Sequence, residues 1–151
     1  MQRRQIPLVS LQRGGHRQVM GIDWKQTYLS GSAPMDMEHQ QWLDKANRFL
    51  RAGNALERLA AALELRDYTA LHFRHEEDLM RQVQYPDTKA HIRSHAGTLI
   101  HMNLLFQQLQ NGTLCMDKWE AFLEDLFTKH MGDADHKLAA YVSCHMRLRS
   151  G

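Results

Sequence analysis

Apolar residues recur three and four positions apart along most of the chain, which is the spacing of one face of an α-helix. The clearest stretch follows residue 88 and contains Ile92, Leu99, Met102, Leu105, Phe106 and Leu109. The same spacing predicts helices at about residues 37–63, 68–83, 88–109 and 117–142. Four helices of this length with short connections predict an all-α, up-down-up-down four-helix bundle.

The limits of these helices come from residues that begin or stop a helix. Asp36, which follows Pro34, and Asp67 are predicted N-caps, because short acidic side chains accept hydrogen bonds from the first free backbone N–H groups. The "YPD" at residues 85–87 is expected to stop the second helix. Gly112 is expected to end the third helix in a left-handed conformation.

The composition fits one helical domain. Of the 151 residues 43% are hydrophobic and 24% charged, and 9 Gly with 3 Pro are few for the turns of an all-β protein. A net charge of +2 does not argue for a nucleic-acid partner, and no run of 18 apolar residues predicts a membrane span. Without repeats or linkers, we predict a domain at residues 23–145, an N-terminal extension at 1–22 and a C-terminal tail at 146–151.

The extension and the cysteines bear on where the protein works. Residues 1–22 hold four arginines and no acid, which suits an organelle transit peptide or a flexible tail, and we favour the tail. Cys115 and Cys144 lie 29 positions apart, about 40 Å along one helix, which is too far for a disulfide. We therefore expect free thiols in a reducing compartment and a cytoplasmic location.

Histidine is the unusual residue of this chain, which contains ten, four of them between residues 71 and 95. His72 and Glu76 are four positions apart, as are His91 and His95, so each pair shares one helix face. On consecutive antiparallel helices the two pairs can face each other across the core, where a metal would satisfy groups that are costly to bury unpaired. One such pair is more often a surface feature, but two of them indicate a metal site.

The remaining histidines are not expected to bind metal. We expect His75, His101, His136 and His145 to be solvated or to cap helices, and His16 lies in the extension.

The stretch "HFRHEEDLM", followed by "YP" and two histidines four apart, resembles the hemerythrin family, in particular its single-domain, bacteriohemerythrin-like bacterial members. The upstream "WKQTYLSGSAPMDMEH" and the downstream "LFTKHMGDAD" resemble the family's first and last segments. The resemblance covers about residues 24–141. It implies two non-haem irons bound by His39, His72, Glu76, His91, His95, His130 and Asp135.

The resemblance also implies how these ligands are shared. His39 and His72 would bind one iron, His91, His95 and His130 the other, and Glu76, Asp135 and a hydroxide or oxide would bridge the two irons. Two six-coordinate irons then keep one vacant position, on the iron with two histidines, and in this family the vacancy takes dioxygen.

Helix geometry alone does not select Asp135. Five positions from His130 is about 140° around a regular helix, and Asp133 lies nearer the same face. We follow the resemblance and expect a π-bulge between His130 and Asp135, since such bulges occur at functional sites. An unbroken α-helix with Asp133 at the metal would contradict this hypothesis.

The resemblance implies reversible dioxygen binding, in a carrier, a store or a protein that delivers O₂ to a consuming enzyme, rather than catalysis. The chain lacks the Glu-x-x-His motif of carboxylate-rich di-iron proteins, which agrees with binding. The alternatives are an O₂ or redox sensor, an enzyme acting on peroxide or nitric oxide, and a zinc site, although zinc needs only four ligands. A dry ligand pocket is expected at Phe127, Leu126, Met131 and Leu99.

Overall fold

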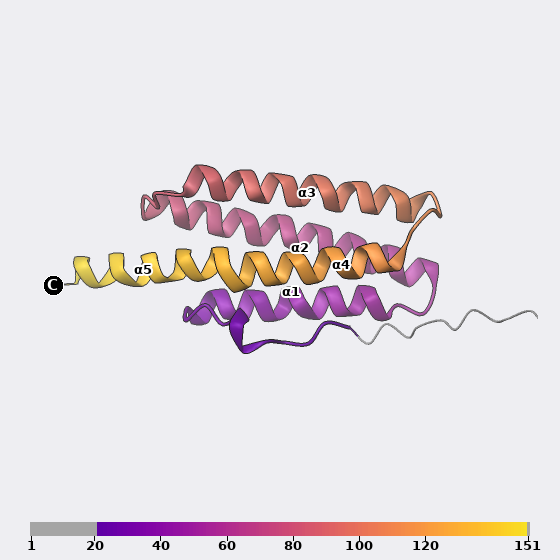
Figure 1. The fold of residues 1–151 in the computed structure, drawn as a ribbon, viewed down its shortest axis with the longest axis horizontal. Helices are drawn as coiled ribbons and strands as arrows, with labels where there is room; N and C mark the ends of the chain where they lie inside the picture. The colour runs from indigo at the N-terminus through magenta and orange to yellow at the C-terminus, as the bar shows by residue number, and fades with distance from the viewer. Residues whose placement is uncertain (1–20, 151) are drawn as a thin grey trace, which may run out of the picture.

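The computed structural model describes residues 21–150, and these form a four-helix bundle in which consecutive rods run antiparallel (Figure 1). The elements are η1 (Gln26–Tyr28), α1 (Ala33–Arg51), α2 (Ala55–Gln82), α3 (Thr88–Gln110), α4 (Met116–Leu126), η2 (Phe127–Ala134) and α5 (Asp135–Arg149). Segment η2 is a π-helix, and α4, η2 and α5 together make the fourth rod. The all-α four-helix bundle predicted from the hydrophobic spacing is confirmed, whereas residues 1–20 of the predicted extension lie outside the described residues.

The first connection of the bundle lies at residues 52–54, and the predicted break between residues 63 and 68 is wrong. The Asn54 side chain accepts a hydrogen bond from the Glu57 backbone N–H at 2.9 Å, and Glu57 Oε2 accepts one from the Gly53 N–H at 3.0 Å. This reciprocal arrangement satisfies two free donors and starts α2 there. Asp67 lies inside α2 and pairs with Arg66, so it caps nothing.

The start of α1 also differs from the sequence expectation. The helix begins at Ala33 with Pro34 in its first turn, where the missing N–H costs nothing. Asp36 is not the cap, because its carboxylate accepts hydrogen bonds from the backbone N–H and the hydroxyl of Ser30, each at 2.7 Å. Asp36 therefore ties the preceding loop to the first turn of the helix.

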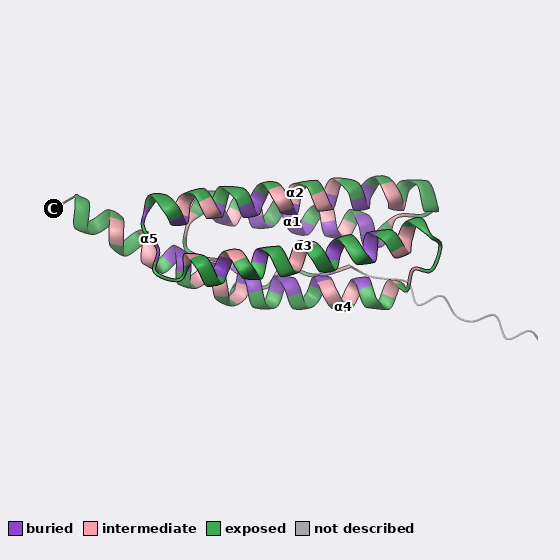
Figure 2. Ribbon diagram, turned by 90° about the horizontal axis from the view of Figure 1, so that it is seen from above, coloured by how far each residue is buried: buried purple, intermediate pink, exposed green. Residues whose placement is uncertain are grey.

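The bounds of the third helix agree with the sequence prediction, whereas the fourth rod ends later than predicted. Helix α3 matches the predicted third helix, and Gly112 after it has φ +69° as expected. The last helix continues to Arg149, so residues 146–149 are helical, and α5 extends beyond the other rods in both views (Figures 1 and 2).

Among the described helices, none is long and apolar enough to cross a membrane. Cys115 and Cys144 are exposed free thiols, as expected.

Buried residues line the inner faces of the rods (Figure 2) and form two apolar clusters. The larger one, here called the aromatic cluster, includes Trp42, Phe49, Phe73, Trp119 and Phe127. The smaller one, here called the methionine cluster, comprises Met35, Met80, Val83, Tyr85, Leu138 and Ala139. Along α1, α2 and the fourth rod, buried histidines and carboxylates lie at positions between the two clusters.

Candidate metal centre

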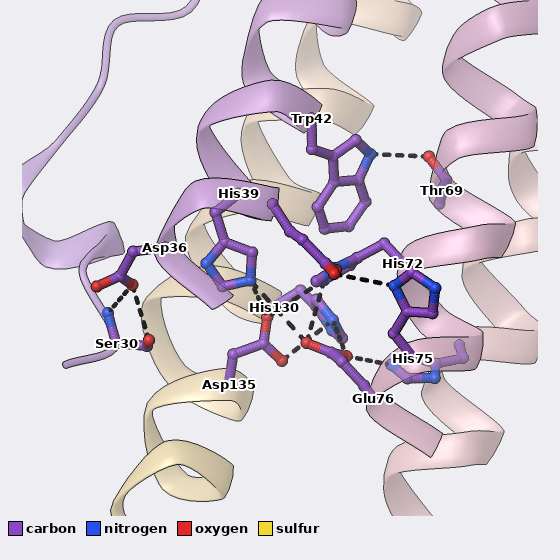
Figure 3. A network of polar contacts seen from close by, with 12 residues as sticks. Ser30, Asp36, His39, Trp42, Thr69, His72, His75, Glu76, His130 and Asp135 are labelled. Carbon is purple, nitrogen blue, oxygen red and sulfur yellow. Dashed lines mark hydrogen bonds and ion pairs between the residues drawn. The ribbon is translucent and has the colours of Figure 1, made fainter. Parts of the chain in front are cut away.

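Buried polar side chains meet between the two clusters, and all seven predicted metal ligands are among them. Figure 3 labels His39, His72, Glu76, His130 and Asp135. Each is at most 7% exposed: His39, His72, Glu76, His91, His95, His130 and Asp135. Helix α1 contributes the first, α2 the next two, α3 the next two, and the fourth rod the last two. The bundle therefore brings together residues that are up to 96 positions apart in the chain (135 − 39).

Glu76 divides its two carboxylate oxygens between two groups of imidazoles. Its Oε1 lies 3.1 Å from His72 Nε2 and 3.9 Å from His39 Nε2. Its Oε2 lies 3.1 Å from both His95 Nε2 and His130 Nε2, and 3.5 Å from His91 Nε2. We call His39 and His72 the two-imidazole group, and His91, His95 and His130 the three-imidazole group.

Asp135 repeats this division from the opposite rod. Its Oδ2 lies 2.9 Å from His39 Nε2 and 4.0 Å from His72 Nε2. Its Oδ1 lies 3.1 Å from His130 Nε2 and 3.5 Å from His91 Nε2. Two carboxylates that each offer one oxygen to either group have the arrangement of bridges between two metal ions.

The donor atoms point into a common space more than at one another. Seven buried atoms of the site have no hydrogen-bond partner: both ring nitrogens of His39, Nε2 of His72 and of His91, Oε1 of Glu76, and both carboxylate oxygens of Asp135. The 2.9 Å approach between His39 and Asp135 thus lacks the alignment of a hydrogen bond. Unpaired buried polar atoms are costly, and metal ions would satisfy nearly all of these together. The residues present therefore fit a metal site.

The π-helical segment explains why Asp135 rather than Asp133 reaches the centre. Segment η2 spans residues 127–134, and the wider turn brings His130 and Asp135 to the same side. Asp135 is 0% exposed, whereas Asp133 is exposed and pairs with Lys137 at 3.2 Å. The expected π-bulge is confirmed.

Two glutamates that the sequence reasoning missed hold ligand imidazoles from outside. Glu38 accepts from Nδ1 of His72 at 2.7 Å with one carboxylate oxygen, and contacts Nδ1 of the exposed His75 at 2.9 Å with the other. Glu77 lies 3.0 Å from Nδ1 of His95. Such partners fix the ring orientation of a metal-bound histidine and raise its basicity. Their positions beside His39 and Glu76 in the sequence were the available signal.

The electrostatics of the site favour positive charge. Burial alone would lower the pKa of His72, but Glu76 and the hydrogen bond to Glu38 outweigh it and raise that pKa to about 10. Burial would likewise lower the pKa of His91, but its contacts with Asp135 and Glu76 raise that pKa to about 9. Burial would raise the pKa of the Glu76 carboxyl, but His130 and His72 hold it well below its usual value. Two ionised carboxylates in the core require cations, which metal ions supply while displacing protons.

Trp42 forms the apolar wall beside both imidazole groups. Its ring centroid lies 4.8 Å from that of His72, 5.8 Å from that of His130 and 5.3 Å from that of Phe127. The indole N–H donates to the Thr69 hydroxyl at 2.8 Å, which fixes the ring (Figure 3).

The four predicted pocket residues lie in or against the same aromatic cluster. Phe127, Leu126 and Met131 are buried in it, while Leu99 is only partly buried and packs against it. Trp42, which no sequence motif singled out as a site residue, is also in contact with ligand rings.

The remaining histidines lie away from the centre in the described part of the chain. His101 is exposed and its ring lies 4.6 Å from that of Phe122, and His136 donates to the Thr27 carbonyl oxygen at 2.8 Å. His145 is half-buried and stacks on Tyr141. His75 is 51% exposed and bonds to Glu38. Among these, His75 has a closer relation to the site than expected, because Glu38 links it to His72.

The comparisons with known proteins agree with this geometry. No protein-family model matches the sequence. The chain is 26% identical over 126 residues to the protein named Bacteriohemerythrin of Stenotrophomonas maltophilia (strain R551-3), and the match covers 82% of each chain. This similarity supports the hemerythrin family, and together with the buried cluster of histidines and carboxylates it fits a hemerythrin-like di-iron site.

Proposed function

We propose that this chain binds dioxygen reversibly at a pair of iron ions held by the seven buried side chains. The observation that carries the proposal is the division of oxygens at Glu76 and Asp135, each of which turns one oxygen to the two-imidazole group and the other to the three-imidazole group. A site built for a single zinc ion would need four ligands and no second group. The similarity to Bacteriohemerythrin supports iron as the metal.

Each group has a different number of donors for its ion. The three-imidazole group provides three nitrogens and the two-imidazole group two, while both draw on the same two carboxylates. We propose that the ion of the two-imidazole group keeps the vacant position to which an external ligand binds. A ferrous pair in this site would supply the two electrons that reversible dioxygen binding draws on.

The chain's own residues would keep this chemistry reversible by excluding water and fixing the ligands. Trp42, Phe73 and Phe127 are at most 1% exposed and cover the site from the aromatic cluster. Glu38 and Glu77 orient His72 and His95. We propose a binding role, as a carrier, store or delivery protein, rather than catalysis, because the acids nearest the ligands, Glu38 and Glu77, are engaged in holding ligand rings.

The test combines metal analysis with optical spectra of the purified protein. Reconstitution with ferrous salt without oxygen should give two irons per chain. Oxygen should then produce a visible absorption band that disappears when the sample is deoxygenated and returns on re-exposure. Fewer than two irons per chain, or steady oxygen consumption with excess reductant instead of a reversible band, would contradict the proposal.

A further inference from the structure

Two cavities reach the buried centre from different sides of the bundle. One, of about 380 Å³, lies among α1, α2 and α5 and touches His72 and Glu76. The other, of about 650 Å³, lies between α3 and the fourth rod and touches His130. We call them the α1–α2–α5 cavity and the α3–α4 groove. They therefore end at different imidazole groups.

We propose that the α1–α2–α5 cavity is the route by which a small apolar gas reaches the two-imidazole group. The inference deepens the proposed function and rests on it, because a route matters only if that group's ion accepts an external ligand. Of the two cavities, this one touches a member of the two-imidazole group, His72, together with the shared Glu76.

Apolar side chains form one part of the wall of this cavity, beside the polar residues Ser32, Glu38, His72, His75, Glu76 and Gln82. Met35, Leu79, Val83 and Val142 line it, and all four belong to or pack against the methionine cluster. Unbranched methionine and small aliphatic side chains pack adaptably and let a small guest pass. This apolar part of the lining offers no hydrogen bonds to water, whereas dioxygen needs none.

One charged side chain of the lining, Glu38, is already engaged by two imidazoles. Glu38 lines the cavity, but one of its carboxylate oxygens is bonded to His72 and the other to His75. It therefore holds the ligand ring in place and has little remaining capacity to draw ions inward. The side of the centre that faces the aromatic cluster is closed by the fully buried ring of Trp42.

The α3–α4 groove is larger, but it leads to the three-imidazole group, for which no vacant position is proposed. It reaches His130, whose group already supplies three imidazoles and has no proposed vacancy. Charged side chains also line it, including Lys118 and the ion pair of Lys129 with Asp125 at 2.7 Å. The α3–α4 groove therefore serves as a matched control. The proposed route is chosen because the α1–α2–α5 cavity touches His72, and cavity volume plays no part in the choice.

The first test measures kinetics in the iron-loaded protein. Val142→Trp narrows the α1–α2–α5 cavity from α5, and Ser32→Trp narrows it from the start of α1, where the Ser32 side chain makes no capping bond. A narrowed route raises the barrier without changing either end state. Stopped-flow measurements should therefore show oxygen association and dissociation slowed by the same factor, about tenfold or more, with the affinity unchanged. Ala121→Trp in the α3–α4 groove should change neither rate.

A second readout needs no metal. Xenon under pressure should appear in crystals of the metal-free protein beside Met35 and Val142, and Val142→Trp should displace it. Unchanged rates in both cavity variants, slowing by Ala121→Trp, or xenon confined to the α3–α4 groove would each overturn the route. If the wild-type protein shows no reversible oxygen band, the proposed function fails instead, and the xenon position still decides which cavity admits a gas.

Discussion

The two imidazole groups share their carboxylates and their burial but differ in the number of nitrogens they provide. His39 and His72 are 0% and 1% exposed, and the three members of the other group are between 1% and 7% exposed. Burial therefore does not distinguish the groups, and neither do Glu76 and Asp135, which serve both. The difference lies in two donors against three, and in the cavity that reaches each. In the proposed function, a nearly symmetric pair of sites thus assigns ligand binding to one member by withholding a single side chain.

Removing the shared carboxylate should break both groups together. Glu76→Gln keeps the size of the side chain but removes its charge and leaves only one oxygen as a good metal donor. We expect iron content to fall from two per chain to nearly none, with a loss of affinity greater than the roughly 10- to 100-fold seen for outer partners. Elemental analysis after gel filtration measures it, with circular dichroism to verify the helices.

Asp78→Asn is the matched control for that variant, since Asp78 lies on the same helix and is exposed. It should retain both irons. Full iron content in Glu76→Gln would show that the carboxylate does not bridge the two groups.

Removing one imidazole from the smaller group should separate the groups. His39→Ala leaves one imidazole there, while the three-imidazole group keeps its own donors. We expect about one iron per chain and no reversible oxygen band, measured on the same sample by elemental analysis and spectroscopy. His101→Ala, which alters an exposed histidine, is the control and should behave as wild type. Two tightly held irons in His39→Ala would contradict the assignment of His39.

The outer glutamates should affect one group each. Glu38→Gln weakens the hold on His72, and Glu77→Gln weakens the hold on His95. Each should lower the affinity of one iron by roughly 10- to 100-fold and leave the other nearly unchanged. Competition with a coloured chelator resolves the two affinities. Equal weakening of both irons by Glu38→Gln would mean that it acts on the whole site and not through His72.

The aromatic wall should not distinguish the groups, because Trp42 contacts both His72 and His130. Thr69→Val removes the acceptor of the buried indole N–H, which should cost about 1–3 kcal/mol of unfolding free energy. Thr69→Ser keeps a hydroxyl and should recover part of that loss. Denaturant unfolding of the metal-free protein gives both values, and a Thr69→Val protein as stable as wild type would show that the hydrogen bond adds nothing net.

The order of residues along the chain was enough to predict the helical class and part of the site. The three- and four-residue spacing predicted the bundle, and α3 matched its predicted bounds because its start after "YPD" and its end at Gly112 are set by local chemistry. The two i,i+4 pairs on α2 and α3 were visible as metal-binding pairs, since residues four apart share a face in any helix. His39, His130 and Asp135 came from the resemblance to hemerythrins and not from spacing.

Other features depend on how the rods are placed against one another, and these became visible only in the folded chain. The tertiary structure selected Asp135 over Asp133 through the π-helical turn, assigned Glu38 and Glu77 to ligand rings, and placed Trp42 against both groups. It also moved the first connection to Asn54, where a reciprocal pair of hydrogen bonds starts α2. Local spacing fixes which side chains share one helix face, whereas convergence of atoms from four rods depends on helix rotation and packing, which no single segment encodes.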